Sequence, residues 1–211
     1  MNENIKNLIN QNKIIVLGAS KTKSKEEIYK VYLDGIKVFG ENYVQELKEK
    51  YEENLPYEFH YIGKLQTNKI KDIVPRVTLI HSVSRLKELK EINKECEKIN
   101  KKISILIELH LTNEDSKNGI NLLDLDTLIK ETQNYPFITL KGFMCMGPND
   151  IDLCKTEEVF CQAHDIFIKY KKTYPSIDTL SMGMSNDYEL AIKHGSTLIR
   201  LGTILFGERQ Y

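Results

Sequence analysis

The sequence lacks the features that mark membrane-spanning, secreted and nucleic-acid-binding proteins. None of its apolar runs approaches the roughly 20 residues that a membrane helix needs. Residues 1–13 are polar and amphipathic, without the apolar stretch of a secretory signal. Lys+Arg and Asp+Glu both number 30, so the chain has no overall basic charge to attract nucleic acid. These absences predict a cytoplasmic protein without a membrane or nucleic-acid partner.

Cysteine is also scarce, and its spacing forms no motif. The four cysteines make no CxxC pair and no zinc-site spacing with histidine. Scattered single thiols are typical of a reducing compartment. No GxGxxG sequence follows the first apolar run, which argues against a dinucleotide-binding sheet. No long exposed apolar stripe stands out, which favours a monomer.

Eight short apolar runs alternate with helical patterns along the whole chain. Strict alternation predicts parallel βαβ units, and eight units without a linker predict one closed (β/α)8 TIM barrel over residues 1–211. An open doubly wound sheet is the second choice. The expected strands are 14–18, 38–41, 58–63, 78–82, 103–111, 138–146, 179–182 and 197–201. The expected helices are a short leading helix at 3–12, then 24–33, 43–53, 68–73, 85–99, 125–133, 157–170 and 188–194, with a loop after residue 201.

Lys21 stands just after the first buried strand, IIVLG, and before a helix that starts near Ser24. In parallel α/β folds, binding sites form at the carboxyl edge of the strands. A lysine in an apolar environment loses its proton more readily, and a neutral amine can attack an aldehyde. Lys21 is therefore predicted to be a nucleophilic amine, and an ordinary surface lysine is the competing interpretation.

Small and hydroxyl residues follow the last two expected strands. Such loops bring N–H groups and hydroxyls to an anion, and in many barrels they form a phosphate site. Turns and a helix cap would use the same residue types. A phosphate here and an amine at Lys21 together describe a ligand with a phosphate and an aldehyde, as in pyridoxal 5′-phosphate. The loop residues are Ser181, Gly183, Ser185, Gly202 and Thr203.

Arg200 lies one strand period before Gly202, so its side chain is expected to point toward the same ligand. A permanent cation beside the pyridine nitrogen would keep that nitrogen unprotonated and the ring a weaker electron sink than with an Asp partner. An outward-facing arginine in a surface ion pair is the alternative.

Seven stretches of the chain resemble the pyridoxal phosphate homeostasis proteins, which are similar to the N-terminal barrel of alanine racemase. They cover almost the whole sequence, so the resemblance does not rest on one motif. The stretches are GASKTK (18–23), FGENYVQEL (39–47), FHYIGKLQTNK (59–69), DSKNGI (115–120), LKGFMCMGP (140–148), LSMGMSND (180–187) and IRLGTILFGER (199–209).

The resemblance implies a role for each candidate residue. Lys21 would form the Schiff base with the cofactor, and Arg200 would face the pyridine nitrogen. Lys117 would be a nearby second amine. The phosphate would be held by Ser185, Gly202 and Thr203, with Ser181 in the same loop, and the pocket would be lined by Asn42, Tyr43, His60 and Met144. From pattern alone, a buried histidine such as His60 is more often a core residue.

The resemblance also implies a function. Its members hold pyridoxal 5′-phosphate and act in intracellular homeostasis and delivery of the cofactor, which affects amino-acid and keto-acid balance, without established turnover. Apoenzymes that depend on the cofactor would be transient partners. The alternative is an amino-acid racemase or related enzyme, which would need a second acid/base on the opposite face of the cofactor. A phosphosugar-metabolising barrel is a third possibility, with Glu41 and Glu108 as its only candidate carboxylates.

Overall fold

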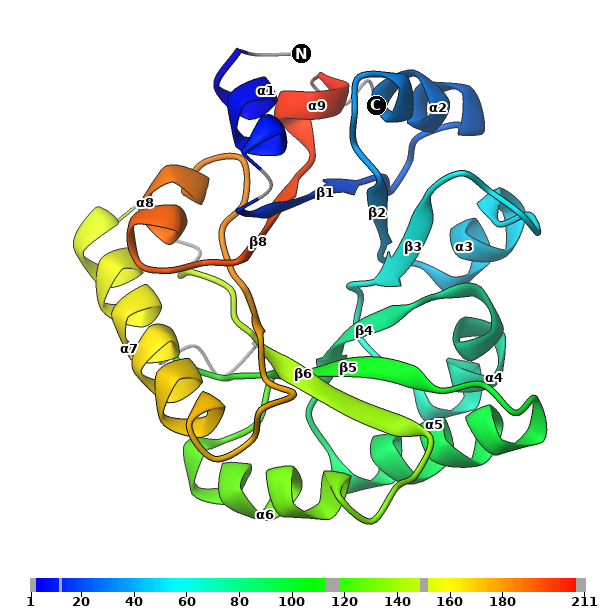
Figure 1. The fold of residues 1–211 in the computed structure, drawn as a ribbon, viewed down its shortest axis with the longest axis vertical. Helices are drawn as coiled ribbons and strands as arrows, with labels where there is room; N and C mark the ends of the chain where they lie inside the picture. Colours follow the sequence, from blue (N-terminus) through cyan, green and yellow to red (C-terminus); the bar gives the residue numbers. More distant parts are fainter. Residues whose placement is uncertain (1–2, 12, 113–117, 149–151, 208–211) are drawn as a thin grey trace.

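The computed structural model describes residues 3–11, 13–112, 118–148 and 152–207. Eight strands pair in parallel, each with its neighbour in sequence, and the pairing of β8 with β1 closes them into a barrel (Figure 1). This confirms the predicted (β/α)8 barrel and excludes the open sheet. The strands are β1 Ile15–Ala19, β2 Val38–Glu41, β3 Glu58–Tyr61, β4 Leu79–Val83, β5 Ile103–Glu108, β6 Ile138–Met144, β7 Thr179–Ser181 and β8 Leu198–Leu201.

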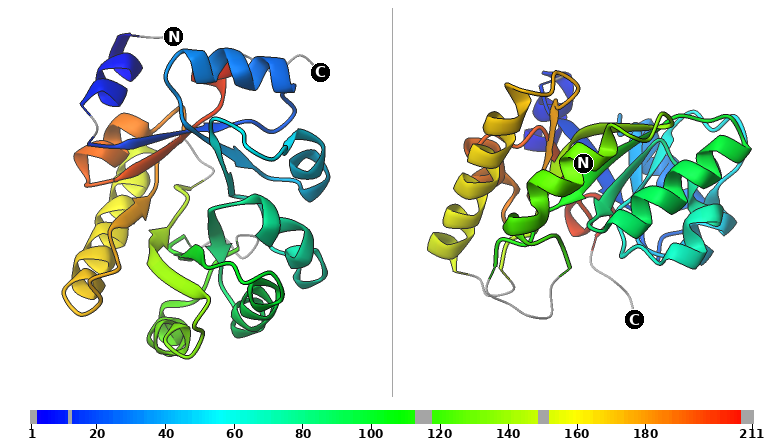
Figure 2. Two further views of the ribbon diagram at one scale, coloured as in Figure 1. Left: turned by 45° about the vertical axis from the view of Figure 1, so that its right-hand side comes forward. Right: turned by 90° about the horizontal axis from the view of Figure 1, so that it is seen from below.

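Helices surround the barrel as an outer ring, and the leading helix lies outside β1 and β8 (Figures 1 and 2). Short 3-10 segments at Thr67–Lys69 and Val74–Arg76 flank the fourth helix. The helices are α1 Glu3–Asn10, α2 Lys25–Leu33, α3 Val44–Lys50, α4 Ile70–Ile73, α5 Leu86–Lys98, α6 Leu122–Thr132, α7 Leu153–Lys171, α8 Tyr188–Lys193 and α9 Thr203–Phe206.

The apolar strand residues pack against the helices, while the barrel interior is partly polar. Phe39 of β2, Phe143 of β6 and Phe160 of α7 are fully buried in the main core. A smaller cluster of Leu79, Leu106 and Met144 is separate from that core. Parallel strands covered on both faces are buried along their length, and all five residues of β4 are buried, including the polar His81 and Ser82.

Several boundaries differ from the sequence-based expectation; for example, β5 ends at Glu108 and α6 begins at Leu122, each earlier than expected. The segment after β8 was predicted to be a loop, but Thr203–Phe206 forms the one-turn helix α9. Helix α3 ends at Lys50, earlier than expected. Helix α7 begins at Leu153, earlier than expected, because the Asp152 carboxylate accepts hydrogen bonds from the N–H groups of Cys154 and Lys155 at 3.0 and 3.2 Å.

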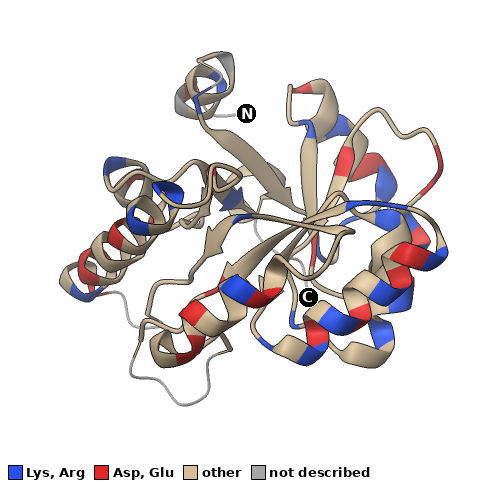
Figure 3. Cartoon of the chain, turned by 60° about the horizontal axis from the view of Figure 1, so that its bottom comes forward, with Lys and Arg blue, Asp and Glu red and all other residues tan. Residues whose placement is uncertain are grey.

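Charged residues of both signs are mixed along the outer helices, and the strands carry few of them (Figure 3). This arrangement agrees with the equal numbers of acidic and basic residues in the sequence. Among the described helices, none combines the length and the apolar character that crossing a membrane requires.

Helix α2 starts with a capping box that fixes where the segment after Lys21 becomes helical. Ser24 Oγ accepts from the Glu27 N–H at 3.2 Å, and Glu27 Oε2 accepts from the Ser24 N–H at 2.8 Å. We expect Ser24→Ala to lower the free energy of unfolding by about 1 kcal/mol, because one N–H group of the first turn loses its acceptor. Urea unfolding measures this loss, and Ser24→Asp, which keeps an acceptor, should restore most of it.

Candidate functional site

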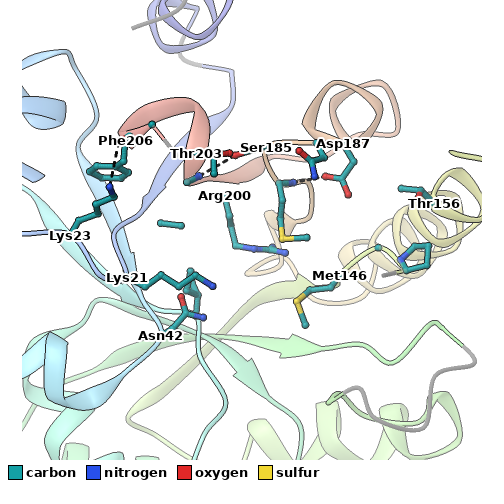
Figure 4. Close-up of a pocket in the computed structure, with 18 of the residues that line it drawn as sticks. Lys21, Lys23, Asn42, Met146, Thr156, Ser185, Asp187, Arg200, Thr203 and Phe206 are labelled. Atoms are coloured by element: carbon teal, nitrogen blue, oxygen red, sulfur yellow. Dashed lines mark hydrogen bonds between the residues drawn. The ribbon is translucent and has the colours of Figure 1, made fainter. Parts of the chain in front are cut away.

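A cavity of about 480 Å³ opens at the carboxyl ends of the strands. The segments that follow β1, β2, β6, β7 and β8 contribute to its wall (Figure 4). This is the edge where the sequence analysis placed the binding groups. Because these segments follow different strands, only closure of the barrel brings them together.

Lys21 lies on a turn directly beyond β1, and its side chain extends into the cavity (Figure 4). The turn is closed by a hydrogen bond from the Lys23 N–H to the Ser20 carbonyl at 3.1 Å. Thr22, the residue after Lys21, has a φ of +66°. A β-branched residue rarely adopts this backbone conformation, so the surrounding contacts must hold the turn in place.

Asn42 follows β2 and lines the same cavity as Lys21. Its side-chain oxygen Oδ1 is buried and has no hydrogen-bond partner among the described residues. Gly63, after β3, packs directly against the Asn42 backbone, since a Cβ there would lie 2.0 Å from the Asn42 carbonyl oxygen. The cavity wall therefore contains a buried acceptor that a bound ligand with an N–H or O–H group would satisfy.

Arg200 belongs to β8, which pairs with β1 on the side opposite to β2. Its side chain lines the cavity and is 6% exposed. Its Nη1 donates to the carbonyl and to the Oγ of Ser181 at 2.9 and 2.7 Å, and its Nη2 donates to the Cys145 carbonyl at 3.0 Å. Burial lowers the pKa of the guanidinium, but an arginine stays protonated in proteins. The three bonds fix a permanent positive charge at one position of the wall.

The loops after β7 and β8 meet at one end of the cavity. Ser185 Oγ accepts a hydrogen bond from the Gly202 N–H at 3.2 Å, which ties the two loops together. Thr203 begins α9, and the first turn of a helix leaves N–H groups without carbonyl partners inside the helix. Ser185, Gly202 and Thr203 all line the cavity, so hydroxyl and N–H donors gather where the sequence predicted a phosphate.

A chain of hydrogen bonds runs from Arg200 into the barrel interior. Ser181 Oγ lies 3.1 Å from His81 Nδ1, and His81 Nε2 lies 3.0 Å from His60 Nδ1. With the Ser181 hydroxyl donating to His81 Nδ1, a neutral His81 carries its proton on Nε2 and donates it to His60 Nδ1. Burial lowers the pKa of His60 to about 3 and that of His81 well below its usual value, so both rings are neutral.

The chain matches the family model of the alanine racemase N-terminal domain over residues 4–210. It is 39% identical to the pyridoxal phosphate homeostasis protein of Pasteurella multocida (strain Pm70), covering 99% of this chain and 94% of that protein. It is 40% identical to the protein of the same name from Aquifex aeolicus (strain VF5), covering 93% and 87%. The chain belongs to the pyridoxal phosphate homeostasis proteins, within the alanine racemase N-terminal domain family.

A solved structure supports the same placement of the chain in this family. The chain superposes on PipY of Synechococcus elongatus PCC7942, solved with pyridoxal phosphate bound, with a TM-score of 0.88 and 28% identity. The match covers 97% of this chain and 99% of PipY. The resemblance inferred from the sequence and the barrel fold are thereby confirmed.

Besides Gly183 of the predicted phosphate loop, four residues predicted for the pocket do not line the cavity. Three of them, His60, Met144 and Ser181, are buried in the barrel below the cavity. Ser181 contacts the cavity residue Arg200, and His60 is connected to Ser181 through His81. Met144 packs on Leu79 and Leu106. Tyr43 is 57% exposed at the start of α3. Alternation along a strand predicts which side chains point inward, but it does not predict how deep they lie.

Several residues that line the cavity were not predicted from the sequence. Met146, two residues beyond Met144, lies in its wall, and Leu153 and Thr156 come from the start of α7. Lys23 lies over the Phe206 ring of α9, with its Nζ 5.9 Å from the ring centroid (Figure 4). The apolar run TILF after Gly202 was the available signal for α9. Lys117 lies outside the described residues.

Proposed function

We propose that this protein binds pyridoxal 5′-phosphate covalently through Lys21 and acts in the homeostasis of that cofactor. The observation that carries the proposal is one cavity that contains an amine, a fixed cation and a cluster of hydroxyl and N–H donors. The names of its relatives, and the pyridoxal phosphate bound to PipY, support the same ligand.

The donor set of the cavity fits this cofactor. The two joined loops with Ser185 and Thr203 offer uncharged donors to a phosphate ester, as anion sites on loops often do. The buried Asn42 Oδ1 needs a donor, and a pyridine ligand with a ring hydroxyl supplies one. Phe206, Met146 and Ile62 supply apolar wall for an aromatic ring.

When bound, pyridoxal 5′-phosphate would supply an aldehyde, and the neutral Lys21 amine would be the nucleophile that attacks it. Lys21 has to lose one proton before it attacks. Arg200 would face the pyridine nitrogen and disfavour its protonation, because two like charges would then be adjacent. Ser181 and Cys145 hold Arg200 in position.

The finer parts of this function are proposals as well. We propose that residues 1–211 form a single domain that acts as a monomer in the cytoplasm, and that apoenzymes receive the cofactor through transient contact. The cavity opens at the rim where Leu153 and Met184 are exposed, so a bound cofactor lies next to a surface that another protein reaches. Analytical ultracentrifugation of the cofactor-loaded protein tests the monomer.

The test is covalent capture by the wild-type chain. Titration of cofactor-free protein with pyridoxal 5′-phosphate should produce a visible absorption band that saturates at one equivalent. Borohydride should make the attachment permanent, and peptide mapping should place the added mass on Lys21. A protein that stays colourless with excess cofactor, or that carries the mass elsewhere, would overturn the proposal.

An amino-acid racemase is the alternative function, and one further measurement distinguishes it from a cofactor carrier. Asp187 is a carboxylate on the cavity wall, but its Oδ1 accepts from the Met184 N–H at 2.5 Å, which fits a loop-stabilising role. We expect the loaded protein to leave each L-amino acid unchanged after prolonged incubation. Chiral chromatography checks this, and steady formation of a D-isomer would favour the enzyme.

A further inference from the structure

A buried ion cluster lies behind the turn that carries Lys21. Lys50 of α3 is 7% exposed, and Glu41 of β2 is fully buried. Lys50 Nζ lies 2.9 Å from Glu41 Oε1 and 2.6 Å from Glu46 Oε2. None of the three residues is part of the described cavity wall. The proposed function therefore leaves this cluster of charges without a role.

The cluster binds the peptide group that precedes the Lys21 α-carbon. Lys50 Nζ donates to the Ser20 carbonyl at 2.8 Å. The Ser20 hydroxyl donates to Glu41 Oε1 at 2.6 Å, so the side chain of the same residue is held as well. Ser20 is completely buried, and its N–H also donates to the Gly40 carbonyl at 3.0 Å. The chain on the N-terminal side of Lys21 is thus fixed at three atoms.

The cluster also binds the peptide group that follows Lys21. Glu46 Oε2 accepts from the Thr22 N–H at 2.7 Å and from Lys50 Nζ. Thr22 is the residue with a φ of +66°, at the turn position where glycine is normally required. A threonine keeps this conformation only where outside contacts impose it. The carboxylate of Glu46 is such a contact, and Lys50 holds that carboxylate.

We propose that Lys50, together with Glu41 and Glu46, is a positioning cluster that fixes the two peptide groups flanking Lys21 and so aims its amine at the cofactor aldehyde. The inference rests on the proposed function. It assigns to residues outside the cavity the task of setting the geometry of the covalent step. Reacting groups have to be aligned closely, and a displacement of about 1 Å lowers such rates by roughly 100-fold.

The composition of the cluster argues for positioning over stabilisation. A buried ion pair contributes little net stability, because removing two charges from water offsets their attraction. Glu41 Oε2 is buried and has no partner among the described residues, so the cluster is not arranged for full hydrogen bonding. Burial raises the pKa of Glu41, a further cost of keeping it charged. What the cluster does achieve is a fixed direction for both sides of Lys21.

The experiment compares the rate of covalent capture with the affinity for a ligand that lacks the aldehyde. Stopped-flow absorbance measures capture of pyridoxal 5′-phosphate, and calorimetry measures binding of pyridoxine 5′-phosphate. We expect Lys50→Met to slow capture by about 10- to 100-fold and to leave the affinity for pyridoxine 5′-phosphate within about twofold. Lys48→Met, on the exposed face of the same helix, is the matched control and should capture at the wild-type rate.

A second pair of variants at the partly exposed Glu46 isolates the contact with Thr22. Glu46→Ala removes the acceptor and should slow capture about tenfold. Glu46→Gln keeps an oxygen that accepts from the Thr22 N–H and should recover most of the rate. A purely structural role does not predict this recovery together with unchanged pyridoxine 5′-phosphate affinity. This pair decides the question if Lys50→Met does not fold.

The outcomes separate the two proposals. Capture by the wild-type protein with equally fast capture by the folded Lys50 and Glu46 variants overturns the positioning role alone. A parallel loss of capture, pyridoxine 5′-phosphate affinity and thermal stability also overturns it, because the cluster would then be structural. Absence of capture by the wild-type protein overturns the proposed function and this inference with it.

Discussion

Lys21→Ala is expected to abolish covalent attachment of pyridoxal 5′-phosphate. The variant lacks the amine, while Arg200 and the loops with Ser185 and Thr203 remain, so reversible binding should persist with weaker affinity. The fold should change little, because Lys21 is partly exposed and such substitutions usually alter the free energy of unfolding by less than about 1 kcal/mol. Mass spectrometry after borohydride treatment should detect no label.

The matched control is Lys23→Ala, because the Lys23 amine lies on the same wall of the cavity. Its Nζ is 3.2 Å from Glu27 Oε1 and 3.4 Å from the Phe206 carbonyl oxygen, so its contacts direct it to α2 and α9. We expect Lys23→Ala to take the full label on Lys21. Label on Lys23 in the Lys21→Ala protein would show that proximity alone selects the amine, and the assigned role of Lys21 would be wrong.

The residues that sequence reasoning placed correctly in the cavity share one property: they lie just beyond a strand or at its last positions. Lys21, Asn42 and Gly202 follow β1, β2 and β8, and Arg200 points inward from β8. The alternation of strands and helices fixes the order of these positions, and the parallel barrel places them on one edge. At such positions the local sequence is enough to predict a cavity residue, because the barrel fold brings the strand ends together.

The residues that sequence reasoning misplaced depend on depth or on tertiary contact. His60 and Ser181 are buried but do not line the cavity, and the strand stagger that sets the depth of an inward side chain is not visible in the sequence. Tyr43 is one residue beyond Asn42 but is exposed and does not line the cavity. The sequence did not predict a role for Lys50, because a lysine in a charged helix normally faces solvent.

Glu108→Gln is expected to stabilise the protein at pH 8 and to have no such benefit at pH 4.5. Glu108, at the end of β5, is 4% exposed, and burial raises its pKa to about 7 from an ordinary value of 4.5. Between pH 4.5 and 7 the folded chain therefore holds a proton on Glu108 that the unfolded chain has released. A raised carboxyl pKa contributes stability below pH 4.5 that is lost as the pH rises through 7, by about 3 kcal/mol in total.

Urea unfolding of both proteins from pH 4.5 to 8 measures the effect as the difference between their curves. His60 and His81 have lowered pKa values, so the free energy of unfolding falls as the pH falls below 6.5. This loss is the same in both proteins and cancels in the difference. Glu58→Gln, at the exposed start of β3, controls for the loss of one negative charge. A difference between wild type and Glu108→Gln that stays constant with pH would mean that the pKa of Glu108 is not raised, so that the carboxylate is ionised in the folded protein over the whole range. Since Glu108 shares the barrel interior with Arg200, that result would also add a negative charge beside the cation assigned to the cofactor ring.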